Sequence, residues 1–174
     1  MTYWKYLIWF LLLYFLTIIQ VSFLPHFSIR GAAADLIFLV IFLGSFLSNK
    51  KGFFIYAMAI LGGLFLEYYS YLPFFGLWII TLFLLALIIR RLNSAMRQFN
   101  IVSLLITFLI AFLLFKILPL VLVFIFTLIQ KRTLLFPWSF SWQGLLISLS
   151  IDFVIAVFSF YLYEFIYQKR GQRN

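Results

Sequence analysis

The stretch ILGGLFLEYYSYLPFFG, residues 60–76, places a single carboxylate, Glu67, inside a run that is otherwise apolar and aromatic. The pair Gly62 and Gly63 stands one turn before Glu67, and Pro73 to Gly76 has the composition of a turn. Small residues let helix backbones approach closely where lipid removes the hydrophobic force between helices. The stretch therefore predicts a helix that packs tightly on a neighbour and then turns into a second apolar run.

The composition of the whole chain extends this interpretation. The chain has 174 residues, of which 67% are hydrophobic and 23% aromatic, and its mean hydropathy is +1.18. Its 13 Lys and Arg and 4 Asp and Glu are too few to cover the surface of a soluble fold of this size. We therefore predict an all-α integral membrane protein.

Cysteine is absent and His26 is the single histidine. The missing thiols exclude disulfides, thiolate metal sites and a Cys nucleophile, and one histidine cannot form a histidine cluster. The sequence also lacks a nucleophile-bearing serine motif and a glycine loop for phosphate. We therefore expect no catalytic activity, no metal and no cofactor.

Apolar runs define the expected membrane spans, because a hydrocarbon core of about 30 Å needs about 20 helical residues. We predict a single six-span domain over residues 1–174. The fifth run is long for one crossing, so we expect it to tilt, to kink at Pro119 or to continue along the membrane interface. The spans are expected at residues 6–24, 34–48, 53–71, 72–89, 101–129 and 143–167.

The first run has an alternative interpretation as a signal peptide, because the small residues at 31–34 resemble a cleavage site. The run is longer than the apolar region of about 7–15 residues that signal peptides carry, and it is rich in aromatic residues. We therefore expect a retained first span.

The distribution of Lys and Arg predicts the orientation, since cytoplasmic segments carry an excess of these residues. With the N-terminus inside, nine lie on inner segments and three on outer segments, while Lys116 lies within a span. We predict a bacterial inner-membrane protein with both termini in the cytoplasm. The short basic groups suit contacts with lipid headgroups rather than with nucleic acid.

Charged residues within spans are costly and usually face the protein interior. Asp35 and Glu67 both lie near the expected outer ends of neighbouring spans, and Arg30 lies in the loop just before. The sequence permits an outer cluster of these three side chains. The alternative is that Asp35 is only an N-cap acid and Glu67 only an interfacial residue.

Lys116 and Asp152 form a second candidate pair, because their expected depths in the fifth and sixth spans are within side-chain reach. A pair is neutralised at lower cost than either charge alone. The alternative is that Lys116 reaches outward by itself and that Asp152 is protonated.

Several motifs in residues 20–91 together resemble the rod shape-determining MreD family. They are QVSFLP at 20–25, GAAADL at 31–36, GLFLE at 63–67, LPFFG at 72–76 and RR at 90–91. Ala34 stands where the family often has proline, and Glu67 replaces the usual aspartate. The last two spans match only as apolar helices.

The resemblance implies a non-catalytic scaffold that binds the membrane-anchored, periplasmic MreC. Such a scaffold helps to couple MreB filaments to a peptidoglycan polymerase and transpeptidase, and so regulates cell shape. The resemblance also implies a fold similar to the six-helix substrate-binding components of energy-coupling-factor transporters.

That fold provides the alternative function, the uptake of a vitamin or other small molecule. A transporter favours polar or broken helices near mid-membrane, whereas the expected helix midpoints here are mostly Leu, Phe and Ile. The first span also lacks the alanine-rich character that these transporter components use for docking on their coupling subunit. We therefore expect an assembly subunit, with Arg30, Asp35 and Glu67 ordering the surface offered to its partner.

Overall fold

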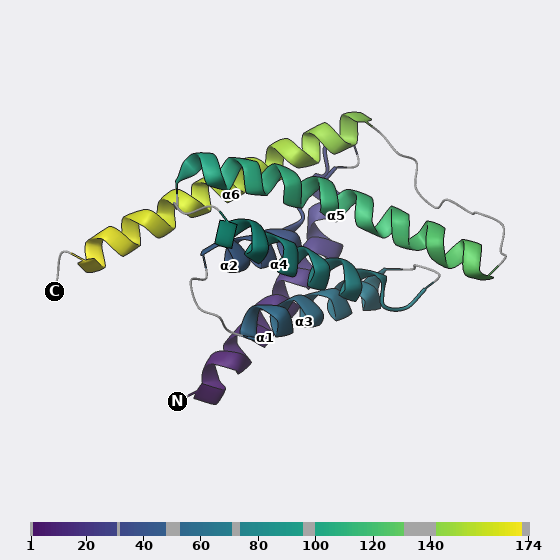
Figure 1. The fold of residues 1–174 in the computed structure, drawn as a ribbon, viewed down its shortest axis with the longest axis horizontal. Coiled ribbons are helices and arrows are strands. Elements are labelled where there is room, and N and C mark those ends of the chain that lie inside the picture. Colours follow the sequence, from purple (N-terminus) through teal and green to yellow (C-terminus); the bar gives the residue numbers. More distant parts are fainter. Residues whose placement is uncertain are drawn as a thin grey trace.

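The computed structural model describes residues 2–30, 32–47, 53–70, 74–95, 100–130 and 142–171, and these residues form an all-helical bundle (Figure 1). A π-helical turn and a 3₁₀ turn follow the first helix directly. Outside the helices, the described residues contain one isolated β-bridge, between Ile29 and Ala32. The elements in order are α1 (Thr2–Ile18), η1 (Ile19–Phe23), η2 (Leu24–Phe27), α2 (Leu36–Leu47), α3 (Phe54–Tyr69), α4 (Leu77–Ala95), α5 (Ile101–Gln130) and α6 (Trp142–Gly171).

Four helical segments of the described chain are long and apolar enough to cross a membrane, as a multi-pass membrane protein requires. These segments are Leu7–Phe27, Leu77–Ser94, Ile101–Ile129 and Trp142–Phe165. Helices α2 and α3 are also apolar, but with 12 and 16 residues they are shorter than the length of about 20 residues that a perpendicular crossing needs. The prediction of an all-helical protein with several membrane-length helices is confirmed.

Helix α2 lies at the centre of the bundle and contacts each of the five other α-helices. Its Phe38, Phe42 and Phe46 recur every four residues and are fully buried. The Phe38 ring stacks on Phe115 of α5 at 4.8 Å, and Phe42 meets Phe108 of the same helix edge-on at 5.3 Å. An aromatic ladder therefore joins α2 to α5. Because other helices surround α2, its residues are apolar on nearly every side.

Helices α3 and α4 cross at Gly63. A Cβ atom on Gly63 would lie 2.5 Å from the Cα of Ile79, so the two backbones touch at this point. Gly62 faces α2, where an added Cβ would lie 3.0 Å from a methyl carbon of Ile37. Gly76, with φ +101°, ends the connection just before α4, a backbone conformation that favours glycine.

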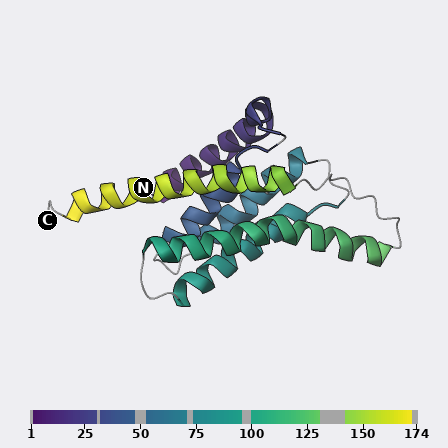
Figure 2. The same cartoon turned by 90° about the horizontal axis from the view of Figure 1, so that it is seen from above.

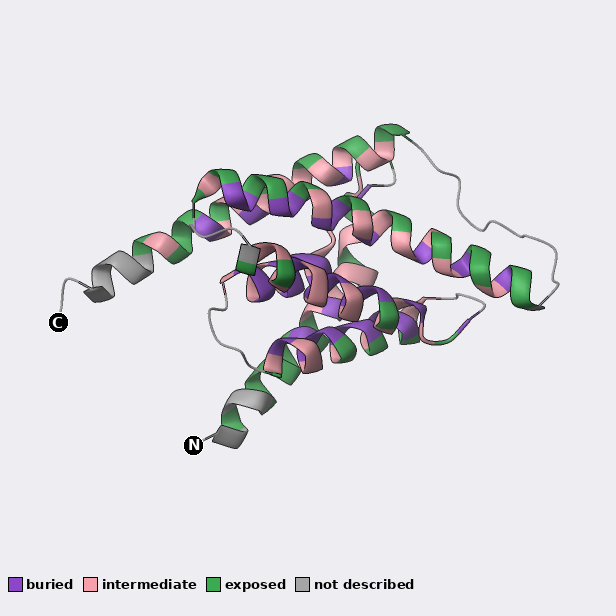
Figure 3. Cartoon of the chain, in the orientation of Figure 1, coloured by how far each residue is buried: buried purple, intermediate pink, exposed green. Residues whose placement is uncertain are grey.

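Helix α1 begins and α6 ends at the same end of the bundle (Figures 1 and 2). The second half of α5 extends beyond the other helices at the opposite end, and α5 continues through Pro119 as one helix. The exposed positions form outward faces on α1, α5 and α6, whereas the faces of α2, α3 and α4 toward the centre are buried (Figure 3). These outward faces are largely apolar, as expected of helices that face lipid.

Candidate functional site

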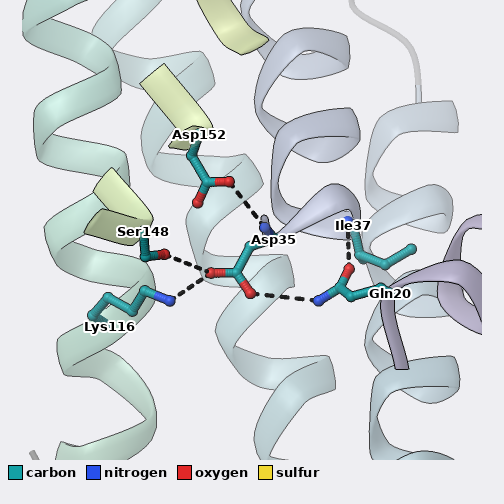
Figure 4. A network of polar contacts seen from close by, with 6 residues as sticks. All are labelled: Gln20, Asp35, Ile37, Lys116, Ser148 and Asp152. Atoms are coloured by element: carbon teal, nitrogen blue, oxygen red, sulfur yellow. Dashed lines mark hydrogen bonds and ion pairs between the residues drawn. The ribbon is translucent and has the colours of Figure 1, made fainter. Parts of the chain in front are cut away.

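Asp35, directly before α2, is the centre of a polar network (Figure 4). Its Oδ2 accepts a hydrogen bond from Lys116 Nζ of α5 at 2.5 Å, and its Oδ1 accepts one from Gln20 Nε2 of η1 at 3.4 Å. Its backbone N–H donates to Asp152 Oδ1 of α6 at 2.9 Å. One residue thus ties the start of α2 to three other elements.

The same network satisfies two backbone amides around the start of α2. The first N–H groups of a helix have no partner within that helix. Here the Asp35 N–H is bonded to Asp152, and the Ile37 N–H donates to Gln20 Oε1 at 2.9 Å. Where lipid replaces water, irregular backbone is tolerated only if protein groups satisfy it. Gln20 and Asp152 meet this need for the residues around the start of α2.

The connection between η2 and α2 turns back on itself before it reaches Asp35. Ile29 and Ala32 exchange two backbone hydrogen bonds of 3.0 Å each, and Arg30, between them, has the left-handed φ of 53°. Arg30 Nη1 donates to Gln143 Oε1 at 2.8 Å, next to the first residue of α6. The turn therefore meets the beginning of α6, whereas Asp35 meets that helix further along.

Asp35 consequently lies beside the middle of α5 and beside a point well inside α6. Lys116 is 15 residues after Ile101 in a helix of 30 residues, so it stands at the middle of α5, about 22 Å from its start. Asp152 is 10 residues after Trp142, or about 15 Å along α6. Asp35 reaches this position because the turn at Arg30 returns the chain into the bundle before α2 begins.

The charges of the site are partly to fully buried. The side chains of Lys116 and Asp35 keep 29% and 19% of their surface exposed. The Lys116 ammonium also lies over the rings of Phe112 and Phe115, at 5.4 and 5.3 Å from their centroids, where the ring faces attract a cation. Asp152 is fully buried, and its Oδ2 has no hydrogen-bond partner in the described part of the chain.

The structure regroups the charged residues that the sequence singled out. Lys116 forms its ion pair with Asp35, and Asp152 bonds to the backbone of Asp35 instead of to Lys116. Arg30 bonds to Gln143, and among the described residues no ion pair joins it to Asp35 or Glu67. The two expected clusters are thus replaced by one, because α5 and α6 both flank the start of α2.

Glu67 has a separate structural role. Its side chain is buried, and its Oε2 accepts a hydrogen bond of 2.8 Å from the backbone N–H of Trp78, the second residue of α4. A carboxylate at a helix N-terminus satisfies an unpaired amide and interacts favourably with the helix dipole. Glu67 of α3 therefore caps the neighbouring helix α4, one turn beyond the Gly63 contact. Pro73, the other predicted turn residue, lies outside the described residues.

Two members of the network were not predicted as site residues. Gln20 entered only through the MreD resemblance, although an amide near the end of an apolar run is itself a signal. Ser148, whose Oγ lies 3.5 Å from Asp35 Oδ2, stands four residues before Asp152 and so on the same helix face. That spacing was the available signal for Ser148.

The chemistry of the site is that of an ion pair with one additional buried carboxyl group. Among the described residues, no group of three or more His, Cys, Asp or Glu side chains is placed to hold a metal ion. The arrangement can fasten helices together. Comparison with known protein families, with curated proteins and with solved structures gave no match to this chain.

Proposed function

We propose that this chain is a non-catalytic scaffold subunit of the bacterial cell-elongation complex that acts as MreD does. In this role it binds MreC and helps to couple MreB filaments to peptidoglycan synthesis. The observation that carries the proposal is the fastening of the α1–α2 connection by Gln20, Arg30 and Asp35. A connection held at three points presents a defined surface, which suits a subunit that works by binding.

The surface of this connection is apolar. Phe23, Phe27 and Ile29 are exposed to between 58% and 67%, and the two phenylalanine rings lie 4.9 Å apart. Large apolar side chains on a rigid connection are typical anchors of protein interfaces. The residues that fasten this surface include Gln20 and Asp35, which also belong to the motifs of the MreD resemblance.

The proposal includes six membrane crossings, with α2 and α3 as the two short ones. The start of α1 and the end of α6 lie at the same end of the bundle (Figure 1), as an even number of crossings requires. The excess of Lys and Arg assigns that end to the cytoplasm of a bacterium. The surface formed by Phe23, Phe27 and Ile29 then lies at the periplasmic end of the first crossing, on the side of MreC.

Affinity capture of the tagged, full-length chain from its native bacterium tests the proposal, with MreC recovery as the readout. We expect Phe27→Ala to reduce MreC recovery at least about tenfold, the effect of losing about 1.4 kcal/mol at an interface. Phe158→Ala is the matched control, because Phe158 of α6 is 68% exposed and Phe27 is 67% exposed. Absence of MreC from the wild-type capture, at normal expression, would overturn the proposal.

The second candidate function is a substrate-binding component of an uptake transporter. The specific observation in its favour is that α2 begins beside the middle of α5 with buried polar groups around its N-terminus, a feature of transporter sites. A transporter component should bind a vitamin-like ligand when purified and should co-purify with an ATPase module. Capture of the ATPase module without MreC would favour this second function.

A further inference from the structure

The Asp152 carboxyl group has more hydrogen-bonding capacity than the described structure uses. The residue is fully buried on α6, and its Oδ1 accepts the Asp35 N–H. Its Oδ2 has no partner among the described residues, although buried polar atoms are nearly always paired. Figure 4 shows the Asp152 carboxyl group against the backbone of Asp35, whose own carboxyl group lies next to Ser148 and Lys116.

The charges around Asp152 do not balance if both aspartates are ionised. Asp152 is bonded to the backbone of Asp35. The side chain of Asp35 is bonded in turn to Lys116 of α5, the neutral Gln20 of η1 and the neutral Ser148 of α6. Lys116 is the one cation of this group, and its ammonium is bonded to Asp35. A second ionised carboxylate in this apolar interior would lack a countercharge, which is strongly unfavourable.

We propose that Asp152 is the binding site for one proton, held on Oδ2, and that this proton keeps Lys116 on Asp35. A proton neutralises the carboxylate without further ligands. A metal ion needs several oxygen ligands, and the described residues form no group able to supply them. The proton site goes beyond the scaffold function and does not depend on it.

Loss of the proton changes the network in a defined way. The O–H bond at Oδ2 breaks, the proton passes to water, and Asp152 becomes a carboxylate. Two carboxylates then compete for Lys116, so the bond that ties Asp35 to α5 weakens. The start of α2 and the turn at Arg30 loosen with it, which makes the exposed connection sensitive to proton binding.

Infrared spectroscopy of the full-length protein in lipid nanodiscs detects the proton directly, through the carbonyl stretch of a protonated carboxylic acid. The chain has only two aspartates, Asp35 and Asp152. Labelling the side-chain carboxyl carbon of aspartate with ¹³C should therefore shift this band in the wild-type protein, without any substitution. If no shifted band is present at any pH at which the protein stays folded, the proposal is overturned.

Substitutions assign the band to one residue. We expect Asp152→Asn to remove the ¹³C-sensitive band and Asp152→Glu to replace it with a band that no longer shifts on aspartate labelling. The matched control is Glu164→Gln, which removes the other acid of α6 and should leave the band unchanged. A band that survives Asp152→Asn belongs to Asp35 and would overturn the assignment.

The effect on the connection is measured with a spin label at Ile29→Cys, a clean site because the chain has no cysteine. We expect label mobility to rise with pH over the range in which the infrared band disappears. The same label should show little change with pH in the Asp152→Asn background, where the amide cannot ionise. Mobility that follows sodium concentration at constant pH, and not pH itself, would overturn the proton as the bound species.

Discussion

Lys116 Nζ and Asp35 Oδ2 lie 2.5 Å apart and join the middle of α5 to the residue that precedes α2. The two residues are 81 positions apart in the chain. Their pairing neutralises both charges, and it sets how far α2 lies along α5. The stacked rings of Phe38 and Phe115 continue the contact between α2 and α5. The ion pair therefore fixes the position of the central helix α2 along α5.

Removal of the ammonium by Lys116→Met should lower the free energy of unfolding by about 1–2 kcal/mol. The charge of Asp35 then loses its partner, and the partial exposure of both side chains keeps the cost below that of a fully buried pair. Unfolding in mixed micelles measures the change. Lys116→Arg, which retains the charge, should recover part of the loss. Equal stability of Lys116→Met and wild type would contradict the role assigned to this pair.

Gly63→Ala should destabilise the α3–α4 contact by about 1–3 kcal/mol, because the new methyl group would lie 2.5 Å from the backbone of Ile79. Gly62→Ala is the matched control on the same helix. Its methyl group would meet a side-chain methyl group of Ile37 at 3.0 Å, which needs to shift by only a few tenths of an ångström, so a smaller loss is expected. Thermal unfolding in detergent compares the two, and an equal or larger loss in Gly62→Ala would argue against a backbone contact at Gly63.

Glu67→Ala should cost about 1 kcal/mol of stability, since the Trp78 N–H loses its acceptor and the α4 N-terminus loses a favourable charge. Hydrogen exchange at the Trp78 amide should accelerate, which separates a lost cap from a general loss of packing. Glu67→Gln retains an oxygen acceptor and should show a smaller effect on both measurements. Glu164→Ala, in the last part of α6, should leave Trp78 exchange unchanged.

Gln20→Leu should reduce stability by about 1–3 kcal/mol, because the Ile37 N–H at the start of α2 loses its acceptor inside the bundle. Gln143→Leu is the control, since Gln143 also accepts one hydrogen bond from a distant residue but does so at an exposed site. The control should cost no more than about 0.5 kcal/mol. A comparable loss in both variants would show that burial of the Gln20 bond is not what matters.

The orientation of the chain is tested with single cysteines in the cysteine-free sequence. Ile29 follows the first long segment, Leu7–Phe27, whereas Asn100 directly precedes the long helix α5, and both positions are exposed. A membrane-impermeant maleimide should label Ile29→Cys in intact spheroplasts and Asn100→Cys only after the membrane is opened. Labelling of both positions from the outside would exclude the proposed topology.

Residues 60–76 show how far the sequence alone leads. Gly62, Gly63 and Glu67 predict a close helix contact with a carboxylate next to it, and the structure has both features at the α3–α4 crossing. The bond partner of Glu67 was not predictable, because it is a backbone amide and every residue except proline carries one. Spacing cannot distinguish an amide of α4 from the side chain of Arg30.

The charged cluster shows the limit of prediction from sequence more clearly. The sequence alone determined that the protein is helical and apolar, because hydropathy and residue types act locally. It also identified Asp35, Lys116 and Asp152 as the costly groups that need partners. Only the tertiary structure decided which of these groups bond to one another, since the turn at Arg30 brings Asp35 between α5 and α6. Which groups bond depends on how far along its helix each residue lies and on which way its side chain points, and neither is encoded in local composition.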